Sequence, residues 1–390
     1  MNKYLLLVSL FCCLAAKSQK SASDYLKHAH EVMKVKNIAG QVQYLEQNVY
    51  RSPILREMEV RIRTNDLGLS PDDYRFRLGI LNPAEMKANR NYHSSQLIFV
   101  KSQYLSELNK ELVTRYNRLI SYRFLVEHGQ LLNEVTRQLD QKFQLQNSLS
   151  DLMRLDELKL KLELRRQGLA FDLERITGLL EADSLYFDFE WIGLPQMNSV
   201  IMSLDSANLL SVTLAQNRHD LAEKDFSLEK ARSWSNIGFV QAEYDANSDN
   251  AFNEQLGFQV GLNIPVFNTD RPKLQREKLE LIEREQSISE ENEDVGLEKD
   301  GFIQTFQRAQ AGLRLIDKAL LKYQKVIREV NVENIEDFVD LIDYVTELKS
   351  MKLSYEKDII TNYVDLLGLI GKLASTPRVN YLSQDLRPLD

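Results

Sequence analysis

The stretch RSPILREMEVRIRTND (51–66), followed by a turn and DYRFRLGILNP (73–83), decides the fold. The same order of features returns in RSWSNIGFVQAEYDANSDN (232–250) and LGFQVGLNIP (256–265). Each copy has a helical approach, an alternating strand, a polar turn, a second alternating strand and a Gly-x-x-x-Pro exit. Long helical sequence follows each copy. A duplicated pair of short amphipathic strands between long helices is typical of a channel wall rather than of an active site.

The strands alternate between apolar and polar side chains, so one face of a sheet would be apolar and the other polar. The residues expected on the lipid-facing side are Leu256, Phe258, Val260 and Leu262, and those expected towards a water-filled lumen are Arg75, Arg77 and Gln259. This pattern suits an outer-membrane barrel. A sheet packed on a soluble core alternates identically. The N-terminal leader sequence described below and the flanking helices favour the membrane barrel over the soluble sheet.

Four strands cannot enclose a pore, because a barrel of useful bore needs at least about eight. Given a barrel, the subunits must pool their strands. We therefore expect a trimer in which each subunit contributes four strands to a 12-stranded transmembrane β-barrel.

The rest of the chain is mainly α-helical, with a 3–4 residue spacing of apolar side chains over about 83–144, 155–180, 206–231, 272–330 and 338–373. We expect a signal peptide (1–18), a first repeat (19–182, hairpin about 57–82), a connector (183–205), a second repeat (206–374, hairpin about 238–264) and a C-terminal tail (375–390). Helices of about 55 residues would be ~80 Å long, which favours long helical hairpins that form a tube.

The N-terminus has Lys3, an apolar run and a small-x-small end at Ala16 and Ser18, which predicts a secretory signal peptide. Cys12 and Cys13 raise a lipoprotein alternative, but bulky residues precede them. Removal of this segment would leave no cysteine. No later segment has 18 consecutive apolar residues, so no transmembrane helix is expected.

The chain carries 49 basic and 57 acidic residues, which argues against a nucleic-acid surface. It has no glycine-rich nucleotide motif and no zinc-protease motif, and its five histidines are scattered. Paired acids such as Glu290 and Glu291 are typical of a solvated helix face. We therefore expect no enzyme activity, no cofactor and no metal.

Several motifs resemble those of the outer-membrane efflux proteins, the TolC-like channels of Gram-negative bacteria. The segment LAQNRHDL (214–221) is similar to the opening of the family's repeat helix, and GLNIPVF (261–267) to its hairpin exit. DLLGL (365–369) is similar to the C-terminal segment, with RITGL (175–179) as its counterpart. The sequence departs from the pattern at His219, where proline is usual, and around 330–337, where a glycine-containing tip is usual.

The resemblance covers essentially the whole mature chain and implies a homotrimer in the cell outer membrane, with its helical part forming a tunnel in the periplasm. It also implies a periplasmic adaptor and an inner-membrane pump as partners. The expected function is a passive exit duct of a tripartite efflux or type I secretion system. The alternative, from another functional class of protein, is a periplasmic coiled-coil adaptor or scaffold without a barrel.

Acidic residues cluster at the break between the last two long helices: Glu333, Glu336, Asp337 and Asp340. If a tunnel narrows there, three copies would form a ring of carboxylates that attracts cations and gates the periplasmic aperture. A solvated helix face is the alternative for each of them.

Overall fold

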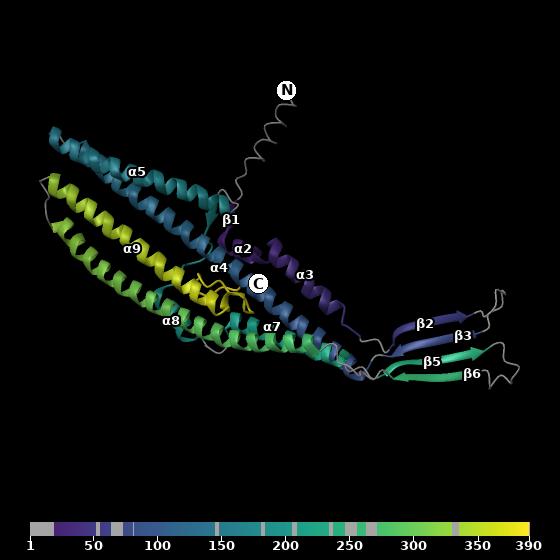
Figure 1. The fold of residues 1–390 in the computed structure, drawn as a ribbon. Coiled ribbons are helices and arrows are strands. Elements are labelled where there is room, and N and C mark those ends of the chain that lie inside the picture. The colour runs from purple at the N-terminus through teal and green to yellow at the C-terminus, as the bar shows by residue number, and fades with distance from the viewer. Residues whose placement is uncertain are drawn as a thin grey trace, which may run out of the picture. The chain divides into compact units, whose positions relative to one another are not determined.

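The computed structural model describes residues 19–51, 55–63, 73–80, 82–144, 148–180, 184–204, 209–233, 237–245, 256–262, 271–329 and 335–389. The elements, in chain order, are β1 (Gln19–Ser21), α2 (Ala22–Lys27), η1 (His28–Glu31), α3 (Met33–Gln47), β2 (Leu55–Arg63), β3 (Asp73–Ile80), α4 (Pro83–Phe143), α5 (Leu149–Leu180), β4 (Ser184–Tyr186), α6 (Leu194–Met202), α7 (Leu210–Ser233), β5 (Ile237–Asp245), β6 (Leu256–Leu262), α8 (Arg271–Glu329), α9 (Ile335–Leu369) and η2 (Lys372–Ala374) (Figure 1).

The four alternating segments form one antiparallel sheet in the order β2-β3-β5-β6. The central pair joins β3 to β5, so each of the two hairpins comes from a different copy of the repeated sequence. The register places Val60, Phe76, Ala242 and Phe258 in one cross-strand row. The mainly α-helical fold with a small sheet is therefore as predicted.

The chain forms two compact units, and each draws on both copies of the repeated sequence. Unit 1 comprises Met1–Lys36, Leu105–Leu209 and Asp294–Asp390, and unit 2 comprises Asn37–Tyr104 and Leu210–Glu293. In unit 1, α5 and α9 pack against α4 around a leucine-rich cluster that includes Leu132, Leu139, Leu155, Leu162 and Ile342. Leucine and isoleucine at helical spacing bury enough apolar area to hold these helices together.

Close approach of α4 and α9 in unit 1 depends on glycine and asparagine. Asn109 Nδ2 donates to the Gly368 carbonyl at 2.6 Å, and a Cβ at Gly368 would collide with Val113. Asn117 Nδ2 donates to Asp365 Oδ1 at 3.0 Å. These contacts explain why DLLGL, singled out in the sequence, stands at this point of α9.

In unit 2, polar side chains link α4, α7 and α8 near the sheet. Arg232 at the end of α7 lies 3.4 Å from the buried carboxylate of Glu85 in α4, and also pairs with Glu229 at 3.0 Å. Lys273 of α8 pairs with the same Glu229 at 2.8 Å. Asn217, from the repeat-opening motif, bonds to Ser102 of α4.

Two parts of the structure differ from the sequence-based expectation, and the irregular C-terminal tail is packed. The helical approach to the first hairpin is divided into α2, η1 and α3, and α3 ends at Gln47. The connector contains β4 and α6, and β4 pairs in parallel with β1. The tail has no regular elements, yet Tyr381, Leu382 and Leu389 are buried. It is therefore packed into unit 1 rather than loose.

No helix among the described residues is both long and apolar enough to cross a membrane. The same residues contain no group of three or more side chains placed to hold a metal ion. The predicted signal peptide with Cys12 and Cys13, the hairpin turns at 64–72 and 246–255, and most of the second exit motif lie outside the described residues.

Candidate functional site

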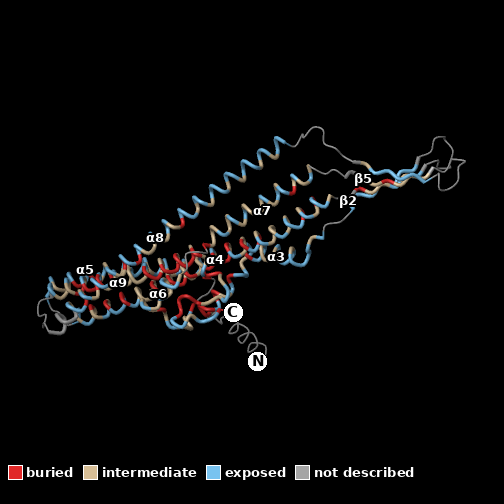
Figure 2. The backbone as a smooth tube through the Cα atoms, turned by 90° about the horizontal axis from the view of Figure 1, so that it is seen from below, coloured by how far each residue is buried: buried red, intermediate tan, exposed pale blue. Residues whose placement is uncertain are grey.

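One face of the sheet is apolar in every described row. Its side chains are Met58, Val60, Ile62, Tyr74, Phe76, Leu78, Val240, Ala242, Tyr244, Leu256, Phe258 and Val260. Most of them are exposed in the single chain, with Phe258 at 81% (Figure 2). An exposed apolar face of this extent is abnormal for a protein in water and marks a surface that something apolar covers.

The opposite face is polar and internally paired. Arg75 Nε lies 2.6 Å from Glu243 Oε1 on the neighbouring strand, and Glu59 accepts from Arg61 at 2.6 Å. Arg77 shares a row with Glu59, Gln241 and Gln259. Leu256, Phe258 and Val260 thus lie on the apolar face, and Arg75, Arg77 and Gln259 lie on the opposite, polar face. The side chain of Leu262 is outside the described set.

An aromatic ring interrupts the polar face. The Arg77 guanidinium lies 3.5 Å from the centre of the Phe239 ring, a cation–π contact. The ring also lies over Gly261 on the next strand, and a Cβ added there would overlap it. Glycine is thus required at 261 because the ring occupies the place of its side chain.

Both outer strands of the sheet are open. Within the described residues, β2 pairs only with β3, and β6 pairs only with β5. Their outer edges therefore present unpaired backbone donors and acceptors, which act as templates for another strand.

The predicted aperture residues lie at the start of α9, in unit 1. Glu336 pairs with Arg154 of α5 at 2.5 Å, whereas Asp337 and Asp340 are exposed. Glu333 is outside the described residues. The pairing continues along the two helices, with Lys161 to Asp343 at 2.6 Å and Arg165 to Glu347 at 3.4 Å. Three basic residues of α5 thus face three acidic residues of α9.

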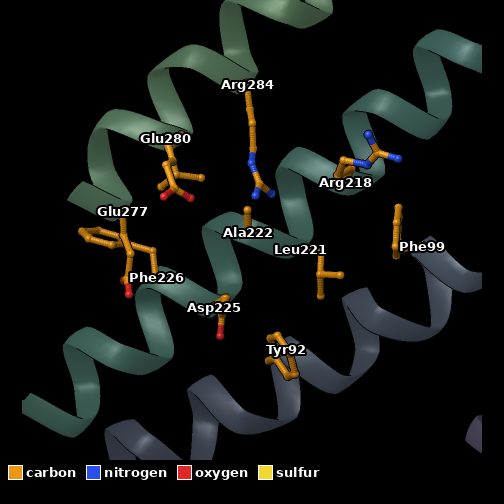
Figure 3. A pocket seen from close by; sticks show the side chains of 11 residues that line it. Tyr92, Phe99, Arg218, Leu221, Ala222, Asp225, Phe226, Glu277, Glu280 and Arg284 are labelled. Carbon is orange, nitrogen blue, oxygen red and sulfur yellow. The ribbon is translucent and has the colours of Figure 1, made fainter. Parts of the chain in front are cut away.

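A small cavity of about 310 Å³ lies between α4, α7 and α8 in unit 2. Figure 3 shows Tyr92 and Phe99 on α4, Arg218 and Asp225 on α7, and Arg284 extending from α8. Burial, together with the Asp225 carboxylate, raises the pKa of Tyr92. The lining combines both signs of charge with aromatic rings, and no catalytic arrangement is evident in it.

The charged form of Glu277, which lines this cavity, is disfavoured by its surroundings. Burial raises the pKa of Glu277; Lys273 lowers it, but the carboxylates of Glu229, Asp225 and Glu280 raise it further. Arg218 and Arg284 line the same cavity as Glu277.

Sequence reasoning missed three residues of the polar face: Glu59, Phe239 and Gln241. Gln241 is only 8% exposed, although it stands on a polar face. The alternation of β5 could have found Phe239 and Gln241, because they stand two residues apart and share the face of Glu243; the irregular pairing with β6 lies before them, between Ile237 and Phe239.

No protein-family model and no curated protein sequence matches the chain. Solved structures do match it. The outer membrane protein VceC of Vibrio cholerae has a TM-score of 0.65 at 10% identity, with 90% of this chain and 96% of that chain covered. The outer-membrane channel OprN has 0.62 at 10%, covering 90% and 89%. The MtrE outer membrane channel of Neisseria gonorrhoeae has 0.57 at 12%, covering 94% and 90%.

These likenesses extend over nearly the full length of both partners. The chain therefore has the fold of the TolC-like outer-membrane efflux channels.

Proposed function

We propose that the protein is an outer-membrane channel, the passive exit duct of a tripartite efflux or type I secretion system. The observation that carries this proposal is the four-stranded sheet, which has one apolar and largely exposed face and one polar face. Lipid tails cover such an apolar face, whereas the polar face needs water, so the sheet suits a barrel wall.

The two open edges support a closed ring of three copies. Because the four strands alternate in direction, β6 of one copy can pair antiparallel with β2 of the next. Closure satisfies every edge donor and acceptor, which lipid cannot do. Three copies give 12 strands, an even number that closes into a barrel of useful bore.

Exposed apolar side chains on the helices of unit 1 also support self-association. On α5, Leu149, Met153, Leu160, Leu164 and Phe171 are exposed. At 100° per residue they fall within an arc of about 60°. On α8, Leu297 and Leu315 are exposed and stand five helical turns apart on one side. A head-to-tail contact of these two stripes would close into a ring of copies.

The tandem repeat of hairpins and long helices, placed in the periplasm, would continue the lumen as a tunnel. Channels of this kind need no nucleotide site, because the energy comes from a pump in the inner membrane that an adaptor links to the tunnel. The outer-membrane channels among the solved structures are similar in fold, which supports this reading for the present chain.

Membrane fractionation and mass measurement test the proposal. The full-length protein, expressed with its leader, should pellet with outer membranes and resist extraction by carbonate and by high salt. In detergent it should have the mass of three copies and, in planar bilayers, conduct ions. A soluble periplasmic monomer that salt releases would instead support the adaptor or scaffold alternative.

A further inference from the structure

A second groove in unit 2, with a volume of about 390 Å³, lies between the first turns of α4 and the last turns of α7. Three lysines line it: Lys87 on α4, and Lys224 and Lys230 on α7. Its floor is made of small side chains, among them Ala84, Ala88 and Ala231. These small side chains leave space beside the lysines for a ligand.

The lysines of this groove lack the carboxylate partners that nearby cations have. Lys87 and Lys230 form no ion pair with any described residue, and Lys224 pairs with its exposed sequence neighbour Glu223 at 3.0 Å. Arg232, close by on α7, contacts both Glu85 and Glu229. The groove thus has a net positive charge, whereas the charge of nearby Arg232 is paired with carboxylates.

The position of the groove relative to the sheet defines its chemistry. The chain leaves β3 at Ile80 and enters α4 at Pro83, and it leaves α7 at Ser233 and enters β5 at Ile237. Lys87 and Lys230 are four and three residues from those helix ends, which is ~6 Å and ~5 Å along the helix axis. The headgroup layer of a bilayer is about 5–7 Å thick on each side. If the apolar sheet face spans the hydrocarbon, both lysines therefore lie at headgroup depth.

We propose that this groove binds the phosphate of an anionic phospholipid in the membrane leaflet on the helix side of the sheet. The proposal rests on the proposed membrane location of the sheet. Lys87 and Lys230 contact the phosphate, Lys224 adds positive charge ~14 Å from the end of α7, and the small alanine side chains accommodate the glycerol. The helix side chains of α4 tilt towards the helix N-terminus, so Lys87 leans towards the sheet and the lipid.

Lipid titration of the purified full-length protein in detergent, followed by native mass spectrometry, tests this site. The probes are dioleoylphosphatidylglycerol, dioleoylphosphatidylcholine and inorganic phosphate. Each lysine near an anionic lipid surface contributes about fivefold in affinity. The triple variant Lys87→Gln, Lys224→Gln, Lys230→Gln should therefore bind phosphatidylglycerol at least about tenfold more weakly than the wild type.

Two further variants make the result specific. Lys299→Gln, Lys318→Gln, Lys349→Gln removes the same charge from lysines of unit 1 that form no ion pair with described residues, and it should bind like the wild type. The triple Lys→Arg variant of the groove retains the charge and should keep most of the affinity. Equal phosphatidylglycerol binding by the groove and control glutamine variants would overturn the proposal. Phosphate binding without a phosphatidylglycerol preference would overturn the lipid as its ligand.

Insertion into vesicles of pure phosphatidylcholine separates this inference from the proposed function. Wild type and the groove variants should all insert, because the sheet and not the lysines drives insertion. Failure of the wild type to insert would contradict the channel. Insertion without any preference for phosphatidylglycerol would contradict only the groove.

Discussion

At the scale of single residues, the contact between Phe239 and Gly261 determines how two strands can approach. A methyl group at 261 would overlap the Phe239 ring, whereas a methyl group at Gly257 meets only Glu243 Cβ at 3.8 Å. We expect Gly261→Ala to destabilise the hairpin by about 1–3 kcal/mol, a typical cost of overpacking. Gly257→Ala is the matched control and should be tolerated.

Urea-induced unfolding of the assembled protein measures this difference. Phe239→Ala removes the ring, so adding it to Gly261→Ala should recover part of the loss. A double variant that shows simple additivity would contradict the contact, because coupled neighbours give a non-additive result.

Neighbouring residues on β6 should differ sharply in their tolerance of a charged substitution, because they lie on opposite faces of the sheet. Phe258 and Val260 stand on the apolar face and Gln259 on the polar one. Phe258→Arg or Val260→Arg should cost about 2–4 kcal/mol near the bilayer midplane, whereas Gln259→Arg should assemble normally. The yield of trimer in outer membranes is the measurement. Equal defects in the two classes would show that lipid does not cover this face.

At the scale of elements, periodic patterns in the sequence predicted most of the structure. The expected helix at 83–144 is α4 (Pro83–Phe143), and both hairpins occur close to their expected bounds. The patterns succeed there because each strand or helix has one face that must be buried or covered. They could not predict the pairing of β1 with β4, since three-residue strands have no periodicity.

The charged contacts were only partly predictable. The sequence marked the acids of α9, but it could not show that Arg154 neutralises Glu336, because that contact joins residues far apart in the chain. Phe239 was missed because its side chain is apolar, although it alternates in step with Gln241 and Glu243 on the polar face. Contacts of this kind depend on tertiary register, which alternation alone does not specify.

One partly buried carboxylate on α9, Glu356, should make stability depend on pH. Burial raises the pKa of Glu356 above its ordinary value. The cations Lys352 and Arg123 lower this pKa, whereas the carboxylates of Glu127 and Asp317 raise it, and the net shift is upward. Since the folded state holds this proton more tightly than the unfolded state, stability should fall as pH rises from about 4.5 through the folded pKa. Glu356→Gln should therefore increase the urea midpoint at pH 7 and have little effect at pH 4.

The exposed carboxylate Asp358 on the same helix provides the control. Asp358→Asn should change the free energy of unfolding by less than about 0.5 kcal/mol at pH 7. A Glu356→Gln variant that is less stable at pH 7 and equally destabilised at pH 4 would show that packing, not the charge, dominates at this position.

At the scale of the whole molecule, the α5 and α8 stripes should meet between copies. Leu160 of α5 and Leu297 or Leu315 of α8 are exposed in one copy, whereas Leu155 of α5 is buried. We expect Leu160→Cys, combined with Leu297→Cys or Leu315→Cys, to give cross-linked dimers and trimers on oxidation, because a head-to-tail ring joins different faces. Leu155→Cys in the same combinations should stay monomeric on denaturing gels. Cross-linking that never exceeds a dimer would contradict a three-membered ring.

The acids at the start of α9 should set the ionic preference of the assembled pore. Asp337 and Asp340 form no ion pair with any described residue, whereas Glu336 is paired with Arg154. Three copies of these two exposed carboxylates at a narrow mouth would create a negative ring that favours cations. The variant Asp337→Asn, Asp340→Asn should therefore move the reversal potential in planar bilayers towards that of a non-selective pore. The shift should be large in 0.1 M salt, where the Debye length is about 10 Å, and small in 1 M salt, where it is about 3 Å.

The control variant Glu290→Gln, Glu293→Gln removes the same charge from exposed positions of α8 and should leave the reversal potential unchanged. Equal shifts in the two double variants would mean that the start of α9 is not the selective mouth.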